Sequence, residues 1–190
     1  MNHQVILLGA FQETIELCEL CGMKIVGIID NNQQGLYSGY PILGTDNDIK
    51  DIAERYKDIP LVNGPDSSVV KKKLFEKYSN AGFRFISVIS PKANISKSAV
   101  LGDGCIVQSG VNISSNAKIG CFCKLNFNVN VMHDVRVGNF TIIAPNAVLL
   151  GRSQIGEAVY IGANSTIEHD SVINRESRVQ TASYIVNNNE

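Results

Sequence analysis

The chain has 190 residues, with 17 Lys and Arg against 18 Asp and Glu, a formal net charge of −1 and 44% hydrophobic residues. This is an ordinary globular composition, long enough for one large domain or two small ones. It offers no basic excess for a nucleic-acid partner and no apolar run near the ~20 residues that span a bilayer. The apolar start has neither the length nor the flanks of a signal peptide, so we expect a cytoplasmic protein.

Residues 1–90 alternate strand-like and helix-like segments. Strands are predicted over 5–10, 24–30 and 83–90, and amphipathic helices over 12–22 and 67–82. On the second helix, Lys71, Lys72 and Lys73 are expected to form a solvated face. This order predicts a small Rossmann-like α/β domain with a parallel sheet.

The remaining residues follow a different rule, a period of six. Every sixth residue is Ile, Leu or Val: Ile95, Leu101, Val107, Ile113, Ile119, Leu125, Val131, Val137, Ile143, Leu149, Ile155, Ile161, Ile167, Ile173, Val179 and Ile185. The residue four places after each of the first fifteen is small or Val-sized, from Ala99 to Ser183. Such a repeat indicates a solenoid of short strands joined by corners, rather than a helix or a lone strand.

Three hexads per turn give an 18-residue triangular coil, and 95–184 gives about five coils. The residue after the aliphatic is often Gly or Asn, as at Gly120, Gly138 and Asn126. We expect these residues to supply the left-handed backbone of a tight corner.

There are five cysteines: Cys18, Cys21, Cys105, Cys121 and Cys123. An odd count without an export signal favours reduced thiols. Cys18 and Cys21 have the C-x-x-C spacing of a metal pair, but no second pair accompanies them. We therefore expect buried, inert thiols and no metal site.

The hexad array resembles the left-handed parallel β-helix of the hexapeptide acyltransferases. "GIIDNNQQGLYSGYPILG" and "KKKLFEKYSNAGFRFISVISPKANIS" are similar to a subfamily that acetylates bacterial surface sugars. That subfamily includes sialic acid O-acetyltransferases and N-acetyltransferases of nucleotide-linked 4-amino sugars. The resemblance implies a sugar-binding α/β domain over 1–90, a β-helical acyltransferase domain over 91–190, and a homotrimer with active sites between subunits.

The resemblance also implies roles for single residues. His133, followed by Asp134 and by "IIAPNAVLLG", matches the family's general base, which takes the proton of the attacking amine or hydroxyl. Histidine titrates near neutral pH and a neighbouring carboxylate can orient it. Asn126 matches an active-site Asn, and Gly151 matches a glycine whose N–H faces the thioester of acetyl-CoA. Acetyl-CoA contacts are implied for Ile142, Gly162 and Ala163 as well.

His169 lies 36 residues after His133, two coils on, and is expected on the same face. It lacks the downstream proline-bearing segment, so we expect it to be a surface residue.

Sugar contacts are implied for Gly9, Ala10, Glu13, Asp30 and Asn31. Here the chain departs from the family, whose turn after the first strand is glycine-rich and ends in His. Glu13 stands where that His would be, and a carboxylate there would repel a pyrophosphate.

The resulting expectation is an acetyl-CoA-dependent acetyltransferase of a surface-polysaccharide sugar precursor. N-acetylation of a nucleotide-linked 4-amino sugar comes first. O-acetylation of a sialic-acid-like sugar is one alternative, and a non-catalytic trimeric scaffold is another. Acetyl-CoA and a small-molecule sugar are the expected partners, with no nucleic acid, membrane or metal.

Overall fold

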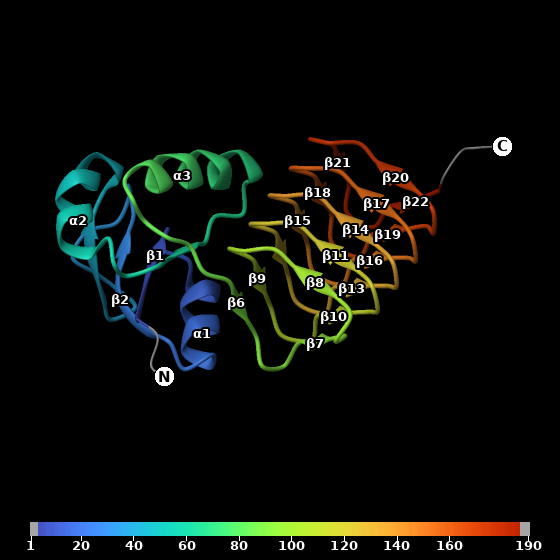
Figure 1. The fold of residues 1–190 in the computed structure, drawn as a ribbon, viewed down its shortest axis with the longest axis horizontal. Coiled ribbons are helices and arrows are strands. Elements are labelled where there is room, and N and C mark those ends of the chain that lie inside the picture. The colour runs from blue at the N-terminus through green and yellow to red at the C-terminus, as the bar shows by residue number, and fades with distance from the viewer. Residues whose placement is uncertain (1–3, 187–190) are drawn as a thin grey trace. The chain divides into compact units, whose positions relative to one another are not determined.

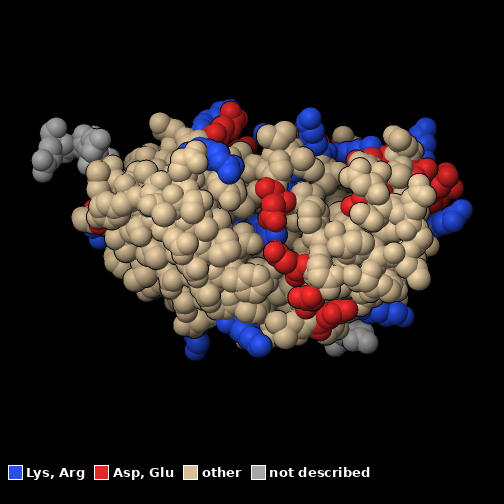
Figure 2. All heavy atoms as spheres, turned by 180° about the vertical axis from the view of Figure 1, so that it is seen from behind, with Lys and Arg blue, Asp and Glu red and all other residues tan. Residues whose placement is uncertain are grey.

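The computed structural model describes residues 4–186 and divides into two units, 1–88 and 89–190. Each unit is described by itself. No helix among the described residues is long and apolar enough to cross a membrane. On the face shown in Figure 2, most of the surface is uncharged, and Lys and Arg stand mostly along its margins.

The first unit is a five-stranded sheet in the order β3-β4-β2-β1-β5. Its strands are β1 (Gln4–Leu8), β2 (Lys24–Ile29), β3 (Leu36–Tyr37), β4 (Tyr40–Gly44) and β5 (Leu61–Asn63). Its helices are α1 (Gln12–Leu20), α2 (Ile49–Tyr56) and α3 (Ser68–Asn80), with a 3₁₀ turn η1 (Asp46–Asp48) before α2. All pairings are parallel except the hairpin β3–β4. The predicted α/β domain is confirmed.

One hydrophobic cluster joins helices α2 and α3 to the sheet. Ile6 and Leu8 from β1 and Ile29 from β2 pack with Ile52 from α2 and Tyr78 from α3. Burying these side chains provides the main driving force for the helices to dock. It also fixes the ends of β1 and β2, from which the loops of the first unit emerge.

Two expectations for this unit are wrong. Residues 83–90 do not form one strand: Phe85 makes a single bridge to Leu61, and only Val88–Ile89 is strand. Lys71 is not solvated, because its side chain is buried and its ammonium donates to the carbonyl of Asn63. The amide of Asn63 in turn donates to the carbonyl of Lys71, at 2.9 Å, which satisfies buried polar groups of both residues.

The second unit is a coil of two-residue strands that form three walls (Figure 1). Wall 1 contains β7 (Asn94–Ile95), β10 (Asn112–Ile113), β13 (Asn130–Val131), β16 (Val148–Leu149), β19 (Thr166–Ile167) and β22 (Tyr184–Ile185). Wall 2 contains β8 (Val100–Leu101), β11 (Lys118–Ile119), β14 (Arg136–Val137), β17 (Gln154–Ile155) and β20 (Val172–Ile173). Wall 3 contains β6 (Val88–Ile89), β9 (Ile106–Val107), β12 (Lys124–Leu125), β15 (Ile142–Ile143), β18 (Tyr160–Ile161) and β21 (Arg178–Val179).

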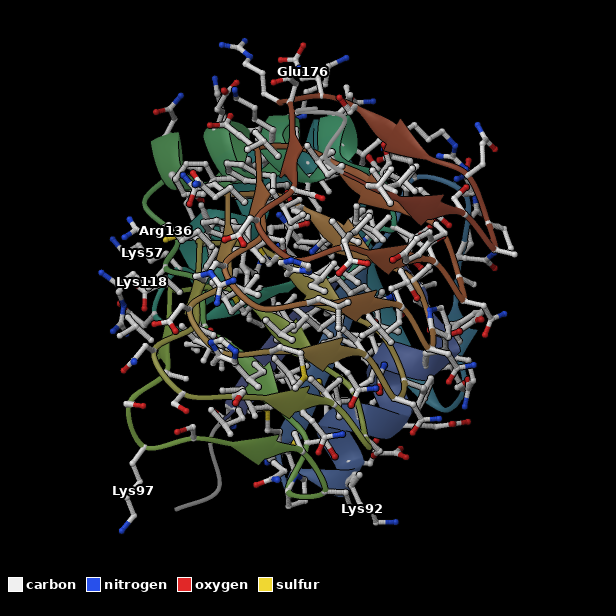
Figure 3. The ribbon with its side chains drawn as sticks, turned by 90° about the vertical axis from the view of Figure 1, so that its right-hand side faces the viewer. Lys57, Lys92, Lys97, Lys118, Arg136 and Glu176 are labelled. Atoms are coloured by element: carbon white, nitrogen blue, oxygen red, sulfur yellow. The ribbon has the colours of Figure 1, made fainter. Side chains whose placement is uncertain are left out.

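The coils repeat every 18 residues. Each strand pairs in parallel with the strand 18 residues on, as when Val131 faces Leu149. On wall 2 the first residue of each strand is exposed, and Lys118 and Arg136 project from it one above the other (Figure 3). The second points inward, where the repeated aliphatic residues and the small ones four places later share a single core. The fold is the predicted left-handed parallel β-helix.

The residues with left-handed backbone at the corners are not the ones that the sequence predicted. The left-handed residues lie three places after the aliphatic, from Asn116 every sixth residue to Ala182, with φ between 56° and 65°. Gly120 and Gly138, which directly follow the aliphatic, do not have positive φ. Instead, a Cβ on Gly138 would come within 2.5 Å of the Glu157 nitrogen in the next coil. These glycines therefore permit close stacking of coils rather than a left-handed turn.

All five cysteines are free thiols. Cys18, Cys105 and Cys123 are buried as expected, whereas Cys21 and Cys121 are only partly buried. In the coil, the thiols of Cys105 and Cys123 each donate at 3.1 Å to the carbonyl of a stacking glycine, Gly120 or Gly138. Burial raises the pKa of Cys18 to about 12, with Cys21 and Glu19 adding to the shift.

Candidate functional site

His133 and Asp134 lie at the corner between β13 and β14, where wall 1 meets wall 2. Stacked corners continue this edge through Ser115–Asn116, Gly151–Arg152 and His169–Asp170. Backbone hydrogen bonds join them: the amide of Asp134 donates to Ser115, that of Arg152 to His133, and that of Asp170 to Gly151. We call this column the His133 edge.

The imidazole of His133 is oriented by the carboxylate of Asp134. Its Nδ1 lies 2.9 Å from Oδ2 of Asp134. A carboxylate can only accept, so Nδ1 carries the proton and the lone pair of the neutral ring is on Nε2. About half of each side chain is exposed, so an incoming molecule can reach the ring. His133 thus has the geometry of a base whose orientation is set by its neighbour.

The carboxyl group of Asp134 is held ionised. The hydrogen bond from His133 lowers its pKa most, and a side-chain hydrogen bond from Asn116 lowers it further. The charges of His133 and Arg152 act in the same direction. An ionised Asp134 therefore places a negative charge beside the imidazole of His133.

Gly151 lies directly beneath this ring. A Cβ on Gly151 would come within 2.7 Å of both Cε1 and Nε2 of His133, so no other residue fits without moving the imidazole. Gly151 is buried, and its N–H has no acceptor among the described residues. An unpaired amide beside a basic nitrogen is the arrangement that could meet a polarised carbonyl oxygen.

The second His-Asp dipeptide of this edge is arranged differently. Arg152 binds the carboxylate of Asp170 with two hydrogen bonds of 2.7 Å, from Nε and from Nη2. His169 turns instead to Glu168. His169 is therefore not hydrogen-bonded to its following Asp, whereas His133 is.

The remaining residues predicted for the coil lie elsewhere. Asn126 follows β12, at the corner where wall 3 meets wall 1, and its amide donates to the carbonyl of Ile143 at 3.0 Å. Gly162 and Ala163 lie on the same edge two coils later, and Ile142 is a buried residue of wall 3. Within one chain, Asn126 is separated from His133 by strand β13. One copy therefore unites His133, Asp134 and Gly151 but not the whole predicted set.

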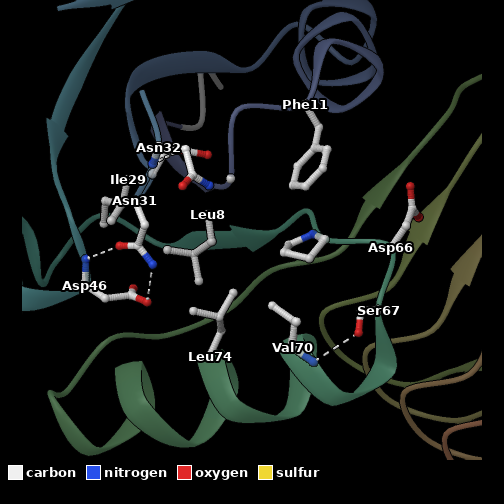
Figure 4. A pocket seen from close by; sticks show the side chains of 13 residues that line it. Leu8, Phe11, Ile29, Asn31, Asn32, Asp46, Asp66, Ser67, Val70 and Leu74 are labelled. Carbon is white, nitrogen blue, oxygen red and sulfur yellow. Dashed lines mark hydrogen bonds between the residues drawn. The ribbon is translucent and has the colours of Figure 1, made fainter. Parts of the chain in front are cut away.

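The residues predicted in the first unit cluster around one cavity. It has a volume of about 310 Å³, and Gly9, Asp30 and Asn31 line it (Figure 4). Ala10 is held beside it, because its N–H donates to Oδ2 of Asp30 at 2.8 Å. Glu13 lies in the first turn of α1 and does not line the cavity.

Sequence reasoning missed Asn116, Arg152 and Asp170 on the His133 edge, although their spacing from Asp134, one coil of 18 residues for Asn116 and Arg152 and two coils for Asp170, could have revealed them. It also missed Phe11 of the first unit, an exposed aromatic residue that lines the cavity. No group of three or more His, Cys, Asp or Glu among the described residues could hold a metal ion.

Comparisons with known proteins agree with this fold. Residues 116–151 match the family model "Bacterial transferase hexapeptide (six repeats)". No curated protein matches the chain. A solved structure of a perosamine N-acetyltransferase variant from Caulobacter crescentus, in complex with CoA and GDP-perosamine, has a TM-score of 0.91 and 25% identity, covering 96% of this chain and 88% of that one.

Two further structures share the fold. The acetyltransferase domain of PglB from Neisseria gonorrhoeae, in complex with acetyl coenzyme A, has a TM-score of 0.87 and 23% identity, over 98% of this chain and 92% of that one. WeeI from Acinetobacter baumannii has a TM-score of 0.59 and 20% identity, over 97% of both chains.

Proposed function

We propose that this protein, an acyltransferase of the hexapeptide-repeat type, transfers the acetyl group of acetyl-CoA to the amino group of a nucleotide-linked 4-amino sugar. The observation that carries the proposal is the His133 edge, where an oriented base, an ionised partner and a buried glycine amide converge. The structures similar to this chain support the substrate classes, since one contains CoA with GDP-perosamine and another acetyl-CoA.

The chemistry needs no covalent enzyme intermediate, because a thioester is already activated. His133 Nε2 takes a proton from the amine as the amine attacks the thioester carbonyl. Asp134 holds the ring and stabilises the imidazolium. The N–H of Gly151 donates to the carbonyl oxygen as it gains negative charge. The thiolate of CoA then leaves, and the proton from His133 can return to it.

We propose that Asn126, Gly162 and Ala163 contribute to the active site of a neighbouring subunit. In a cyclic trimer, the edge of one copy can meet a different edge of its neighbour. The edge between wall 3 and wall 1, which carries Asn126, Gly162 and Ala163, would then face the His133 edge of the next subunit. Asn126 would contact the sugar. Gly162, Ala163 and the backbone near Ile142 would contact acetyl-CoA. Light scattering after size exclusion should give three times the chain mass of 20.7 kDa. The proposal places the enzyme in the cytoplasm, where acetyl-CoA is available.

The experiment that tests the activity follows release of the CoA thiol from acetyl-CoA. The acceptors are UDP-, dTDP- and GDP-linked 4-amino sugars, with free sialic acids as the O-acetylation arm. His133→Ala should lower turnover by roughly 10²–10⁴-fold, the usual contribution of a general base. His169→Ala, two coils away on the same edge, is the matched control and should keep turnover. Absence of turnover with every acceptor would refute the proposal.

A further inference from the structure

Arg152 stands between two carboxylates on the His133 edge. Asp134 precedes it by one coil and Asp170 follows it by one coil, and all three residues occupy the same left-handed corner position, with φ of 61°, 65° and 57° in chain order. Paired strands are about 4.8 Å apart, a step that the Arg152 side chain already covers when it binds Asp170. The register of the coil therefore offers the guanidinium a carboxylate on either side.

The structure pairs Arg152 with Asp170. Nε of Arg152 donates to Oδ1 of Asp170 and Nη2 donates to Oδ2, both at 2.7 Å, so the fork of the guanidinium engages both carboxylate oxygens. These hydrogen bonds are the main cause of the lowered pKa of Asp170. The ring of His169, the residue before Asp170, is hydrogen-bonded to Glu168. Arg152 is thus held on the side away from His133.

The carboxylate of Asp134 serves a different partner. Its Oδ2 accepts the proton on Nδ1 of His133 at 2.9 Å, and the side chain of Asn116 also donates to it. If Arg152 applied the same two-pronged grip to Asp134, it would engage both oxygens. A guanidinium binds a carboxylate more strongly than a neutral N–H does. The ring of His133 would then lose the acceptor that orients it.

This competition is a property of Arg152 in particular. Among the described residues, it is the only Lys or Arg whose charge contributes to the lowered pKa of Asp134, after the hydrogen bonds from His133 and Asn116. Arg136, the next cation along the chain, projects from wall 2 (Figure 3). What keeps Arg152 from Asp134 is therefore what matters for His133.

We infer that Asp170 is a positioning residue, which holds Arg152 one coil away from Asp134 and so reserves the carboxylate of Asp134 for His133. Asp170 acts through Arg152, and neither residue is assigned a contact with substrate. The inference rests on the proposed function for its effect on turnover. Its effect on the ring of His133 needs no substrate.

A simple surface ion pair would behave differently. Both side chains are about half exposed, and exposed pairs contribute little to stability. If the pair only braced the corner, removing either partner would have the same effect. If Asp170 restrains Arg152, the two losses differ: without Asp170 the cation is free to turn to Asp134, whereas without Arg152 there is nothing to restrain.

The first test compares Asp170→Asn, Arg152→Gln and the double variant. Asn suits this left-handed corner, as at Asn116. Asp170→Asn should lower kcat for CoA release by about tenfold, part of the roughly 10²-fold that misplacing a reacting group can cost. Arg152→Gln should stay within about twofold of the wild type, and so should the double variant, because residues that share a partner are non-additive. KM should not change in any of them.

The second test is the tautomer of His133, read from the ¹⁵N shifts of its ring at about pH 9, where histidine is ordinarily neutral. The chain has three histidines, and His133→Ala assigns the signal. The wild type, Arg152→Gln and the double variant should carry the proton on Nδ1. Asp170→Asn should show a substantial share of the Nε2–H form, which lacks the lone pair that a base needs.

Glu176→Gln is the matched control. Glu176 occupies the same left-handed corner position on another edge, and its carboxylate accepts from Arg175 at 3.2 Å. Its loss frees an arginine that is not stacked on Asp134, so kcat and the tautomer should stay as in the wild type. Circular dichroism confirms that each variant keeps the coil.

Three results would overturn the inference. They are an equal fall in kcat in Asp170→Asn and Arg152→Gln, no recovery in the double variant, and a wild-type tautomer in Asp170→Asn. The same measurements separate the two proposals. A tautomer change that Arg152→Gln reverses, without turnover of any acceptor, would support the inference and refute the proposed activity. Turnover with an unchanged tautomer in Asp170→Asn would do the reverse.

Discussion

The imidazole of His133 lies directly over Gly151, which follows it by one coil, and a Cβ on Gly151 would reach within 2.7 Å of Nε2. The contact joins a side chain of one coil to the backbone of the next. The position of the ring therefore depends on the stacking of coils as well as on Asp134.

Gly151→Ala should consequently impair catalysis without unfolding the coil. The new methyl group displaces the ring, and a misplacement of about 1 Å can cost roughly 10²-fold in rate. The measurement is kcat for CoA release, with circular dichroism to follow the fold. Ser115→Ala changes the same edge one coil earlier and should keep kcat. Wild-type kcat in Gly151→Ala would show that the ring position does not matter.

Asp134 should contribute to stability in a pH-dependent way. Its pKa is lowered in the folded protein, chiefly by the hydrogen bond from His133. The stabilisation is therefore fully present above the unfolded pKa of about 3.9. It is lost as the pH falls through the lower folded value. Urea unfolding at pH 6 and pH 3 should show a smaller loss of stability on acidification in Asp134→Asn than in the wild type. An equal loss in both proteins would contradict this linkage.

A side chain on a stacking glycine should destabilise the coil. In Gly138→Ala, the Cβ would lie 2.5 Å from the Glu157 nitrogen and 2.6 Å from the Gly156 carbonyl carbon. Pushing two coils apart should cost about 1–3 kcal/mol, the range for overpacking. Thermal unfolding of Asn174→Ala is the control, because that residue occupies the same corner position two coils later and already has a Cβ. Equal melting temperatures in the two variants would contradict the packing explanation.

Tyr78 should stabilise the first unit through its hydroxyl. It is fully buried, and the hydroxyl donates to Oδ1 of Asp46 at 2.8 Å. Burial, followed by that hydrogen bond, raises the pKa of Tyr78 far above its ordinary value. Tyr78→Phe leaves a carboxylate without one of its donors and should cost about 2 kcal/mol in urea unfolding of this unit. Tyr37→Phe, on the edge hairpin, should change stability by much less.

The coil could be predicted from sequence because its rule is local and repeated. Val131, Leu149 and Ile167 each point inward for the same reason, and sixteen such positions leave no other period. The corners were misinterpreted, since Gly138 was assigned a backbone role. Its real constraint is Glu157 in the next coil, a contact that only three-dimensional stacking reveals.

The first unit was harder to predict because its short elements depend on distant partners. The three-residue strand β5 exists through its pairing with Ile6, Leu7 and Leu8 of β1. The sequence places Lys71 beside Lys72 and Lys73 and so suggests a solvated residue, but its buried ammonium donates a hydrogen bond to the backbone carbonyl of Asn63. At the candidate site, the resemblance to a family singled out His133 and Gly151. The division of His133 and Asn126 between two edges followed only from the folded coil.

The left-handed corner residues have a consequence for how a site can be built on this coil. They include Asn116, Asp134, Arg152 and Asp170 on a single edge, so side chains of very different chemistry satisfy the same turn. A pair placed at one corner can be moved by 18 residues without altering the core. Each such move shifts it by about 4.8 Å, the spacing of paired strands. The distance along the coil between a base and a bound substrate can therefore change only in steps of one coil.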